Sequence, residues 1–385
     1  MSSFDLIVIG AGIHGAAVAR EAAAQGLSVA VLEQFSAPAQ ATSCRSSKLI
    51  HGGLRYLESK QFHLVYECLR EQRILLRTAP HLVHRSEFAI PILPQAKRAP
   101  WLIQMGLYVY WLLGGARPQR LALNTALADG LRTTQFAALL SYADAQTDDA
   151  ALTRAVLASA QSMGARVEFD ASCEQIELQQ ASVAISFRQH ERSEIWRARA
   201  VVNASGPWVN QVLQRVQPPQ ASLAIEWVRG SHIELPGALS RCYYVEAPDG
   251  RAVFILPWQG HRLVGTTERI HRDSIDDCHA SDEEIDYLLE TYNRYFSPAC
   301  QRSQLIDAWA GLRVLPAAKQ SPFTRARDAI LLNDRKSQPR IVSIYGGKLT
   351  SHRATAVRVV KQLDLISKPK LYDTSRQLLP DIFSR

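Results

Sequence analysis

Residues 4–33, FDLIVIGAGIHGAAVAREAAAQGLSVAVLE, carry the feature that most limits what this chain can fold into. The apolar run from Leu6 to Ile9 predicts a strand that is buried on both faces. An Ala-rich segment then predicts a helix that ends at Gly26, and residues 28–32 predict a second strand. Because two parallel strands need a crossover between them, this order predicts a βαβ unit.

Three glycines connect the first strand to the helix with G-x-G-x-x-G spacing. Gly10 permits a tight turn, Gly12 lets a pyrophosphate approach the backbone, and Gly15 lets helix and strand pack closely. The helix N-terminus offers unpaired N–H groups to that pyrophosphate. Glu33, at the end of the second strand, is placed to accept a hydrogen bond from a ribose hydroxyl. Glycines also serve ordinary turns, but the agreement of all these signals predicts a dinucleotide site.

Length and composition set the class of protein. The 385 residues can form one large domain or two interleaved ones, and 47% hydrophobic with 21% charged residues is typical of a soluble globular protein. A net charge of +8 favours anionic ligands, but no Lys/Arg block or motif predicts a nucleic-acid partner. The six cysteines are scattered without a C-x-x-C pair, so they predict neither a disulfide framework nor a metal site and favour the cytoplasm.

The remaining pattern predicts an α/β (α+β) fold in which an antiparallel middle lies between two strand–glycine–helix units. Residues 80–145 show no clear alternation of strands and helices. Helices are expected at 62–77, 149–163 and 351–363, and a further helix is expected from a capping box of Ser281 with Glu284 to Phe296. A three-stranded meander is expected at 167–198, strands at 200–204 and 341–345, and antiparallel sheet over 226–268. The break at 216–220 looks like a domain boundary. We expect a discontinuous cofactor domain (1–80, 146–216 and 305–370), a substrate or cap domain (81–145 and 217–304) and a tail (371–385).

Six motifs allow a more specific interpretation: KLIHGGLRYLE, VNASGPWV, RGSHI, ILPW with LVGTTE, GLRVL and YGGKLTSHR. Together they resemble the FAD-dependent, aerobic-type glycerol-3-phosphate dehydrogenases, from Asp5 to about Pro380. The family usually has Asp at Glu268, Pro at Val314 and Thr at Ala326. Typical members also continue into a helical C-terminal domain, so this chain resembles a short form whose oligomeric state cannot be taken from the family.

The resemblance implies a Rossmann-like FAD-binding domain interleaved with an antiparallel substrate domain, as in the glycine and D-amino-acid oxidases. It implies oxidation of sn-glycerol 3-phosphate to dihydroxyacetone phosphate, with electrons passed to a quinone, in an enzyme that faces the cytoplasm. Two alternatives stay open. One is a flavoprotein of the same fold that acts on an amine or a different hydroxy acid, and the other is a catalytically idle FAD-binding protein.

The reaction needs a base for the hydroxyl proton and cations for the phosphate. His232 matches the family's active-site histidine, and imidazole is the usual base for an alcohol; the alternative is a histidine packed on a strand. Arg313 and Lys348 complete the catalytic set, because a phosphate dianion requires several cations. Substrate contacts are expected from Arg55, Tyr56, Thr267 and Arg327.

The cofactor contacts are expected to come from the glycine-rich segment, a Ser/Thr-rich loop and the GGKLT turn. That turn would point N–H groups at the flavin edge where negative charge grows on reduction, although it could be a plain Gly-Gly turn. His51 is expected against the flavin ring, where a covalent link is conceivable, His14 is taken as incidental, and residues 203–208 as a second backbone contact. The expected contacts are Gly10, Gly12, Gly15, Glu33, Thr42, Ser43, Ser46, Ser47, Lys48, His51, Gly52, Cys173, Gly206, Gly347, Lys348, Leu349 and Thr350, with no metal.

The longest apolar run, WLIQMGLYVYWLL at 101–113, is shorter than the ~20 residues that span a bilayer. Its aromatic residues favour the headgroup boundary, and basic residues flank it at Lys97, Arg98, Arg117 and Arg120. It therefore predicts either a segment that docks on a membrane surface without crossing it or an ordinary core helix.

Overall fold

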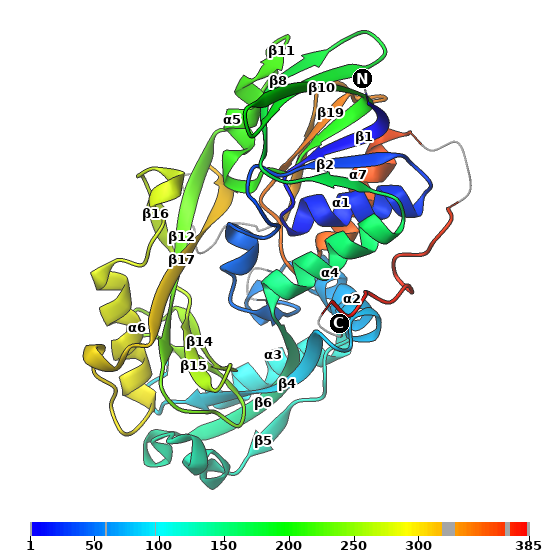
Figure 1. Cartoon of the computed structure of the whole chain (residues 1–385). Helices are drawn as coiled ribbons and strands as arrows, with labels where there is room; N and C mark the ends of the chain where they lie inside the picture. Colours follow the sequence, from blue (N-terminus) through cyan, green and yellow to red (C-terminus); the bar gives the residue numbers. More distant parts are fainter. Residues whose placement is uncertain (1, 58–59, 97, 318–327, 366–369, 383–385) are drawn as a thin grey trace.

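A computed structural model describes residues 2–57, 60–96, 98–317, 328–365 and 370–382 (Figure 1). The predicted N-terminal unit is confirmed. Strand β1 (Ser3–Ile9) leads through the glycines into α1 (Ile13–Ala24) and β2 (Val29–Leu32), which pairs with β1 in parallel. Leu6, Ile7 and Val8 are completely buried, as a central parallel strand requires.

The first sheet runs in the order β11-β8-β9-β10-β1-β2-β7, with β19 beside β10 and β18 beside β19. Helices α1, α4 and α7 pack together against it (Figure 1). Strands β1, β10 and β19 are parallel neighbours, so their carboxyl ends meet at one edge. The remaining bounds are β7 (Arg166–Glu168), β8 (Ala171–Leu178), β9 (Val183–Gln189), β10 (Arg192–Asn203), β11 (Val216–Gln217), β18 (Ile330–Asn333), β19 (Ile341–Tyr345), α4 (Asp149–Ser162), α5 (Val209–Gln214) and α7 (His352–Leu363).

The second sheet is mostly antiparallel and runs β16-β12-β15-β14-β13-β4-β6-β3, with β17 beside β12 and β5 beside β6. Helix α6 packs against it beside β12 and β15, and its predicted capping box between Ser281 and Glu284 is present. The bounds are β3 (Leu49–Ile50), β4 (Val83–Ile92), β5 (Gln119–Leu121), β6 (Ala138–Thr147), β12 (Ile225–Leu235), β13 (Cys242–Glu246), β14 (Ala252–Trp258), β15 (His261–Gly265), β16 (Arg269–His271), β17 (Asp307–Pro316), α2 (Phe62–Thr78), α3 (Pro100–Leu112) and α6 (Asp282–Tyr295).

Several expected elements differ from the structure. The predicted strands around 198 and 200 are one continuous strand, β10, and β7 pairs with β2 instead of joining the meander. The break after Val216 begins with β11, which pairs with β8. Strand β17 falls within the expected cofactor segment 305–370 but pairs with β12 of the second sheet. Residues 80–145 contain β4, α3, β5 and β6, which the sequence did not resolve.

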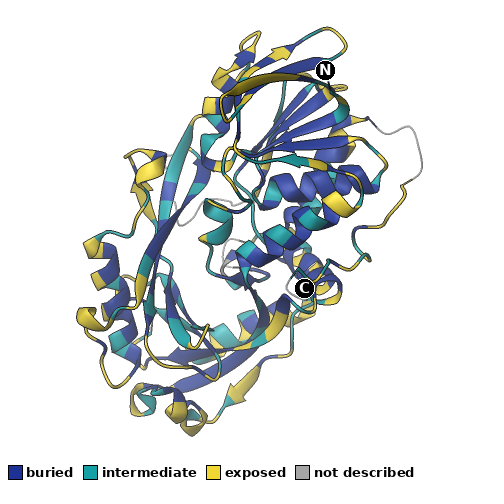
Figure 2. Cartoon of the chain, in the orientation of Figure 1, coloured by how far each residue is buried: buried dark blue, intermediate teal, exposed yellow. Residues whose placement is uncertain are grey.

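Helix α3 lies on the outside of the molecule, as the exposed residues along its ribbon show (Figure 2). Only Leu107 and Tyr110 of this helix are buried. Trp101 is 63% exposed and Leu112 is 76% exposed. The core-helix alternative is therefore wrong for this segment, apart from those two residues. Among the described residues, no helix is both long and apolar enough to cross a bilayer.

Candidate active site

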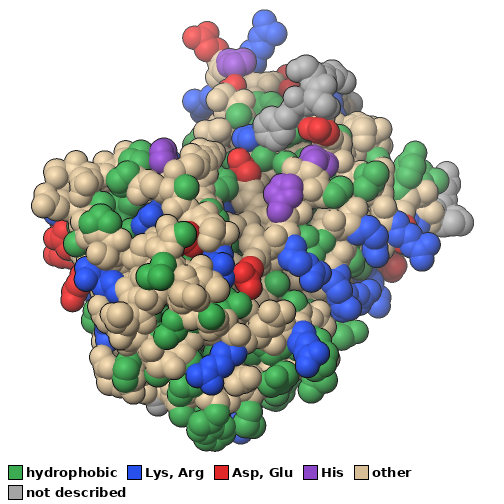
Figure 3. Space-filling model, turned by 90° about the horizontal axis from the view of Figure 1, so that it is seen from below, with side chains coloured by type: hydrophobic (Ala, Val, Ile, Leu, Met, Phe, Trp, Pro, Cys, Tyr) green, Lys and Arg blue, Asp and Glu red, His purple; other side chains and the backbone are tan. Residues whose placement is uncertain are grey.

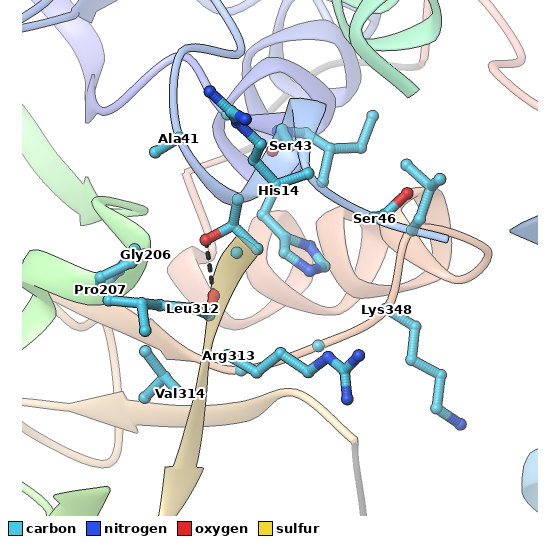
Figure 4. Close-up of a pocket in the computed structure, with 18 of the residues that line it drawn as sticks. His14, Ala41, Ser43, Ser46, Gly206, Pro207, Leu312, Arg313, Val314 and Lys348 are labelled. Atoms are coloured by element: carbon cyan, nitrogen blue, oxygen red, sulfur yellow. Dashed lines mark hydrogen bonds between the residues drawn. The ribbon is translucent and has the colours of Figure 1, made fainter. Parts of the chain in front are cut away.

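A large cavity opens where the carboxyl ends of β1, β10 and β19 face the second sheet. Figure 4 shows that its walls come from segments far apart in the chain, including the loop at 41–46, the turn at 206–207, β17 and the turn that holds Lys348. The expected site residues that line it are Gly10, Gly12, Glu33, Thr42, Ser43, Ser46, Ser47, His51, Tyr56, Cys173, Gly206, Arg313, Gly347, Lys348, Leu349 and Thr350.

The glycine-rich turn has the shape that its sequence predicts. A Cβ added to Gly15 would overlap the carbonyl oxygen of Gly10, and one added to Gly10 would lie 2.8 Å from the carbonyl oxygen of Ala204. At Gly12 the added atom would lie 3.1 Å from Oγ of Ser43, whose hydroxyl accepts a hydrogen bond from the Ile13 N–H at 2.9 Å. The cavity therefore reaches the backbone at the start of α1, where N–H groups suit an anion.

Glu33 and Cys173 line the cavity beside β2 and β8. Glu33 accepts hydrogen bonds from the N–H groups of Ala11 at 2.5 Å and Phe35 at 3.0 Å. Burial raises the pKa of the Glu33 carboxyl and raises the pKa of the Cys173 thiol to about 12. A carboxylate oxygen can accept more than one hydrogen bond, so this end suits the hydroxyls of a ribose.

The GGKLT turn closes the other end of the cavity. A Cβ on Gly347 would overlap the imidazole of His14, and the φ of Gly347 is +102°. The ammonium of Lys348 lies 4.0 Å from the ring centroid of Tyr56 and 3.7 Å from Sγ of Cys68. Thr350 Oγ1 accepts a hydrogen bond from the His51 N–H at 3.1 Å, which fixes the two wall segments together.

Arg313 lies on β17 with its guanidinium in the cavity wall (Figure 4). Nη1 donates to Oε1 of Glu268 and Nη2 donates to Oγ1 of Thr266, each at 3.1 Å. The Arg313 side chain stays 25% exposed, so a planar cation faces the cavity. Two other expected cations, the side chain of Arg55 and the whole of Arg327, lie outside the described residues.

His232 is 1% exposed and lies just behind the cavity wall. Its Nε2 forms a 2.9 Å hydrogen bond with Oγ of Ser47, which lines the cavity, and its ring stacks on Trp309 with centroids 4.2 Å apart. Burial, followed by the charges of Arg313 and Lys48, lowers the pKa of His232 well below 6.5. The imidazole is therefore neutral at neutral pH and can accept a proton.

Besides His232, four expected site residues lie behind the wall instead of lining the cavity. Gly15 serves packing alone, and Gly52 points its N–H at Tyr110. The Lys48 ammonium pairs with Oδ1 of buried Asp149 at 2.7 Å, because a buried charge needs a partner. Thr267 donates to Glu284 at 2.5 Å and accepts from the Ser231 N–H, while its neighbour Thr266 reaches the cavity.

Three polar residues are among the cavity residues that were missed or dismissed in the sequence. His14 lines the cavity against Gly347, and burial with the nearby Arg358 lowers its pKa to about 4. Its place within the glycine turn was the available signal, because residues there face the ligand. Thr266 and Glu268 flank Thr267 in the same motif and line the cavity. The sequence does not indicate which of these three side chains faces the cavity.

The first sheet has parallel central strands with a glycine-rich edge, and it shares one cavity with the mostly antiparallel second sheet. This arrangement is typical of oxidoreductases that use a dinucleotide cofactor. Comparison with known proteins makes this specific, because residues 5–353 match the family model described as FAD dependent oxidoreductase. The chain belongs to this family of FAD-dependent oxidoreductases, so FAD is its cofactor.

Two curated relatives have similar levels of identity. The chain is 35% identical to the D-erythritol 1-phosphate dehydrogenase of Brucella abortus, over 93% of this chain and 73% of the relative. It is 34% identical to the aerobic glycerol-3-phosphate dehydrogenase of Escherichia coli, over 94% of this chain and 74% of the relative. Among solved structures, the glycerol-3-phosphate dehydrogenase of Bacillus halodurans with FAD has a TM-score of 0.78 at 24% identity, covering 98% of this chain and 68% of that one. This likeness confirms the fold.

The cavity fits FAD on its own geometry. The cradle at Gly10 and Gly12 admits a pyrophosphate, Glu33 suits a ribose, and the far end between His51 and Lys348 is walled by aromatic and cationic side chains. Nδ1 of His14, buried in this wall, has no hydrogen-bond partner among the described residues, as expected of a group that faces a ligand.

Proposed function

We propose that the protein oxidises sn-glycerol 3-phosphate to dihydroxyacetone phosphate with FAD as hydride acceptor. The observation that carries this proposal is the presence of Arg313 and Lys348 in the same cavity as the dinucleotide cradle. The cofactor supplies the redox chemistry. The chain has to bind the phosphate, orient the secondary alcohol and remove the hydroxyl proton. The names of both curated relatives support a phosphorylated polyol as substrate.

The phosphate is assigned to Arg313 and Lys348, with Arg55 and Arg327 as further expected cations. Arg313 is held by Glu268 and Thr266, so its guanidinium is oriented before substrate arrives. Lys348 is held over Tyr56. A fixed cation gives up less side-chain entropy on binding than a mobile one, which favours tight and specific recognition of a dianion.

We assign His232 as the acceptor of the substrate's hydroxyl proton, and the proton reaches it through the hydroxyl of Ser47. Ser47 Oγ lines the cavity and is hydrogen-bonded to Nε2 of His232, so the serine can pass a proton to the buried imidazole. This arrangement keeps the base out of contact with water while its depressed pKa keeps it unprotonated.

A longer phosphorylated polyol is a second candidate, because the Brucella abortus relative carries that activity in its name. An amine or hydroxy acid substrate and an idle flavoprotein are the remaining alternatives. All four are separated by one anaerobic experiment in which flavin absorbance is followed after adding glycerol 3-phosphate, erythritol 1-phosphate, glycerol, a small hydroxy acid or a small amine. Glycerol 3-phosphate should bleach the flavin fastest, and a protein that no substrate bleaches is idle.

Arg313→Ala should slow anaerobic bleaching by glycerol 3-phosphate about tenfold or more while FAD content is retained. A charge-assisted hydrogen bond is worth roughly 1.5–3 kcal/mol, and each 1.36 kcal/mol is a factor of ten in rate. Arg188→Ala, which removes a 64% exposed guanidinium on β9, is the control. Wild-type protein that oxidises glycerol as fast as glycerol 3-phosphate contradicts the phosphate assignment.

We further propose that electrons leave to a quinone and that the protein docks on the cytoplasmic face of a membrane through α3. Seven large apolar residues of α3 are exposed, so the helix presents an aromatic face to solvent. Helix α2 adds a second exposed stripe beside it, because Arg73 packs against Gly114 just after α3. This docking surface comprises Trp101, Leu102, Met105, Tyr108, Val109, Trp111 and Leu112 of α3, and Phe62, Tyr66, Arg70, Arg73 and Arg77 of α2.

The charges of the docking surface suit anionic lipid. Its α2 stripe ends in three arginines at i, i+3 and i+7, and Arg117 lies over the ring of Trp111 at 5.9 Å. Arg98 and Arg120 are exposed nearby, whereas Lys97 lies outside the described residues. Figure 3, which views the molecule from below, shows hydrophobic side chains interspersed with Lys and Arg. Basic residues close to anionic lipid contribute about 1 kcal/mol each.

The FAD-loaded protein should sediment with vesicles that contain phosphatidylserine at low salt and be partly released at high salt, because Debye screening weakens the charge attraction. Trp111→Ser should weaken sedimentation several-fold without loss of thermal stability, since Trp111 is 40% exposed. Ile195→Ser, which removes an exposed apolar residue on β10, is the matched control and should sediment like wild type. Wild type that stays in the supernatant at low salt rules out the docking surface.

A further inference from the structure

The peptide of Gly52 is held by side chains from outside the cavity. Its N–H donates to Oη of Tyr110 at 2.9 Å and to Oδ1 of Asp144 at 3.3 Å. A Cβ at this position would overlap both the Tyr110 hydroxyl and the side chain of Leu69, so only glycine lets the tyrosine approach. The preceding residue, His51, lines the cavity.

These contacts belong to a buried network that joins three elements. Tyr110 of α3 donates to Oδ1 of Asp144 on β6 at 2.7 Å. Gln72 of α2 donates from Nε2 to the same oxygen and to the carbonyl oxygen of Ile50, each at 2.7 Å. Tyr110, Asp144 and Gln72 are 0%, 3% and 5% exposed. Residues 50–52 are therefore fixed from behind by the two helices that carry the docking surface.

We propose that Tyr110 is a positioning residue for the cofactor: its hydroxyl holds the Gly52 peptide, and through it His51, in the cavity wall. The inference rests on the proposed function, because it assumes that the flavin binds in the cavity beside His51. The same inner face of α3 thereby connects the docking surface to that wall. Nothing in the proposed reaction requires Tyr110 itself to touch substrate.

The electrostatics of the network supply a second readout. Burial raises the pKa of Asp144 to about 7, and the donors Tyr110, Gln72 and Gly52 act in the opposite direction. The titratable groups that face it are Tyr110 on α3, Tyr142 on the same strand and Cys242 on β13. The carboxyl with this raised pKa lies next to the Gly52 peptide, which directly follows His51 of the cavity wall.

Tyr110→Phe tests the inference, because it keeps the ring against Tyr142 and removes only the hydroxyl. FAD affinity, measured by titrating apoprotein with FAD and following flavin fluorescence, should fall about tenfold, as expected when one buried hydrogen bond at the site is lost. In wild type the absorbance of bound flavin should change with a midpoint near pH 7. The midpoint should rise in Tyr110→Phe, because a donor to the carboxylate is gone, and the change should vanish in Asp144→Asn.

Tyr295→Phe is the matched control. Tyr295 is equally buried and its hydroxyl bonds the backbone of Glu246, but it lies in a separate core beneath the second sheet. It should lose stability without a change in FAD affinity or in the pH midpoint. A Tyr110→Phe protein that matches wild type in both readouts overturns the positioning role. Wild-type apoprotein that takes up no FAD overturns the proposed function instead.

Discussion

Replacing His232 by Asn is expected to lower kcat about a hundredfold or more and to change KM little. The proton acceptor is lost, whereas the phosphate contacts of Arg313 and Lys348 remain, so the loss should fall on the chemical step. Residual activity should rise towards high pH, where hydroxide can replace the imidazole. Because the pKa of His232 is depressed well below 6.5, wild-type kcat/KM should show no loss from its protonation at pH 6.

Two further variants make the experiment decisive. Ser47→Ala should reproduce most of the loss if the proton passes through the Ser47 hydroxyl, and should leave kcat unchanged if His232 acts without it. His271→Asn, at a buried histidine on β16 that bonds the Ser274 carbonyl, should leave kcat unchanged. A kcat of His232→Asn within threefold of wild type would return His232 to the role of a packed core histidine.

Acidification is expected to destabilise the FAD-free protein between pH 6.5 and 5. Burial lowers the pKa of His14 to about 4, that of His352 to about 3 and that of His232 well below 6.5. Each depressed folded-state pKa contributes stability that is complete above the unfolded value of about 6.5 and is lost as pH falls. For His14 and His352 the loss by pH 5 is about 1.6 kcal/mol each, and His232 acts in the same direction. Asp144 acts oppositely: its raised pKa favours folding as pH falls through about 7, offsetting about 2 kcal/mol. The loss from His14 and His352 exceeds this offset by about 1 kcal/mol, and His232 adds to the loss.

Urea unfolding at pH 7.5, 6.5 and 5.0 measures this loss directly. His352→Gln should reduce the slope of the unfolding free energy against pH by the contribution of one histidine. The variant lacks one imidazole that binds a proton in the unfolded state but not in the folded state. His190→Gln, at an exposed histidine, is the control for the substitution. Equal stability at pH 6.5 and 5.0 would show that these imidazoles take up protons in the folded state.

The parts of the site that the sequence predicted are those in which backbone geometry demands a residue type. Gly10 and Gly15 are required because any Cβ would meet backbone, and Glu33 follows from its place at the end of β2. These requirements depend on neighbouring stretches of the backbone, so they can be recognised in the amino-acid sequence. The same holds for the capping box at Ser281, where a side chain bonds its own helix.

The parts that the sequence could not predict depend on which way a side chain faces. Thr266 and Thr267 are neighbours in the connection between β15 and β16, yet the first lines the cavity and the second bonds Glu284. Lys48 follows the Ser/Thr-rich loop but pairs with Asp149, which is a hundred residues away in the chain. Tertiary packing decides both outcomes, and tertiary packing cannot be inferred from a local sequence motif.

Helix α3 shows that the hydropathy of a segment does not by itself predict whether the segment is buried. An apolar 13-residue helix is compatible with a core and with a surface, and its composition does not say which neighbours cover it. The structure places two of its residues, Leu107 and Tyr110, against the protein and leaves the others outside.

The closing of the cavity by Gly346–Thr350 has a consequence for biosynthesis. The pyrophosphate cradle emerges from the ribosome among the first residues, but β19 and the turn after it are made some three hundred residues later. A nascent chain therefore carries an open glycine turn until β19 is made, and from the completion of β10 it also carries an unpaired edge on that strand. Because Gly346–Thr350 form part of the cavity wall, we expect stable retention of FAD only after β19 and this turn have been made, and chains truncated before β19 should bind FAD poorly.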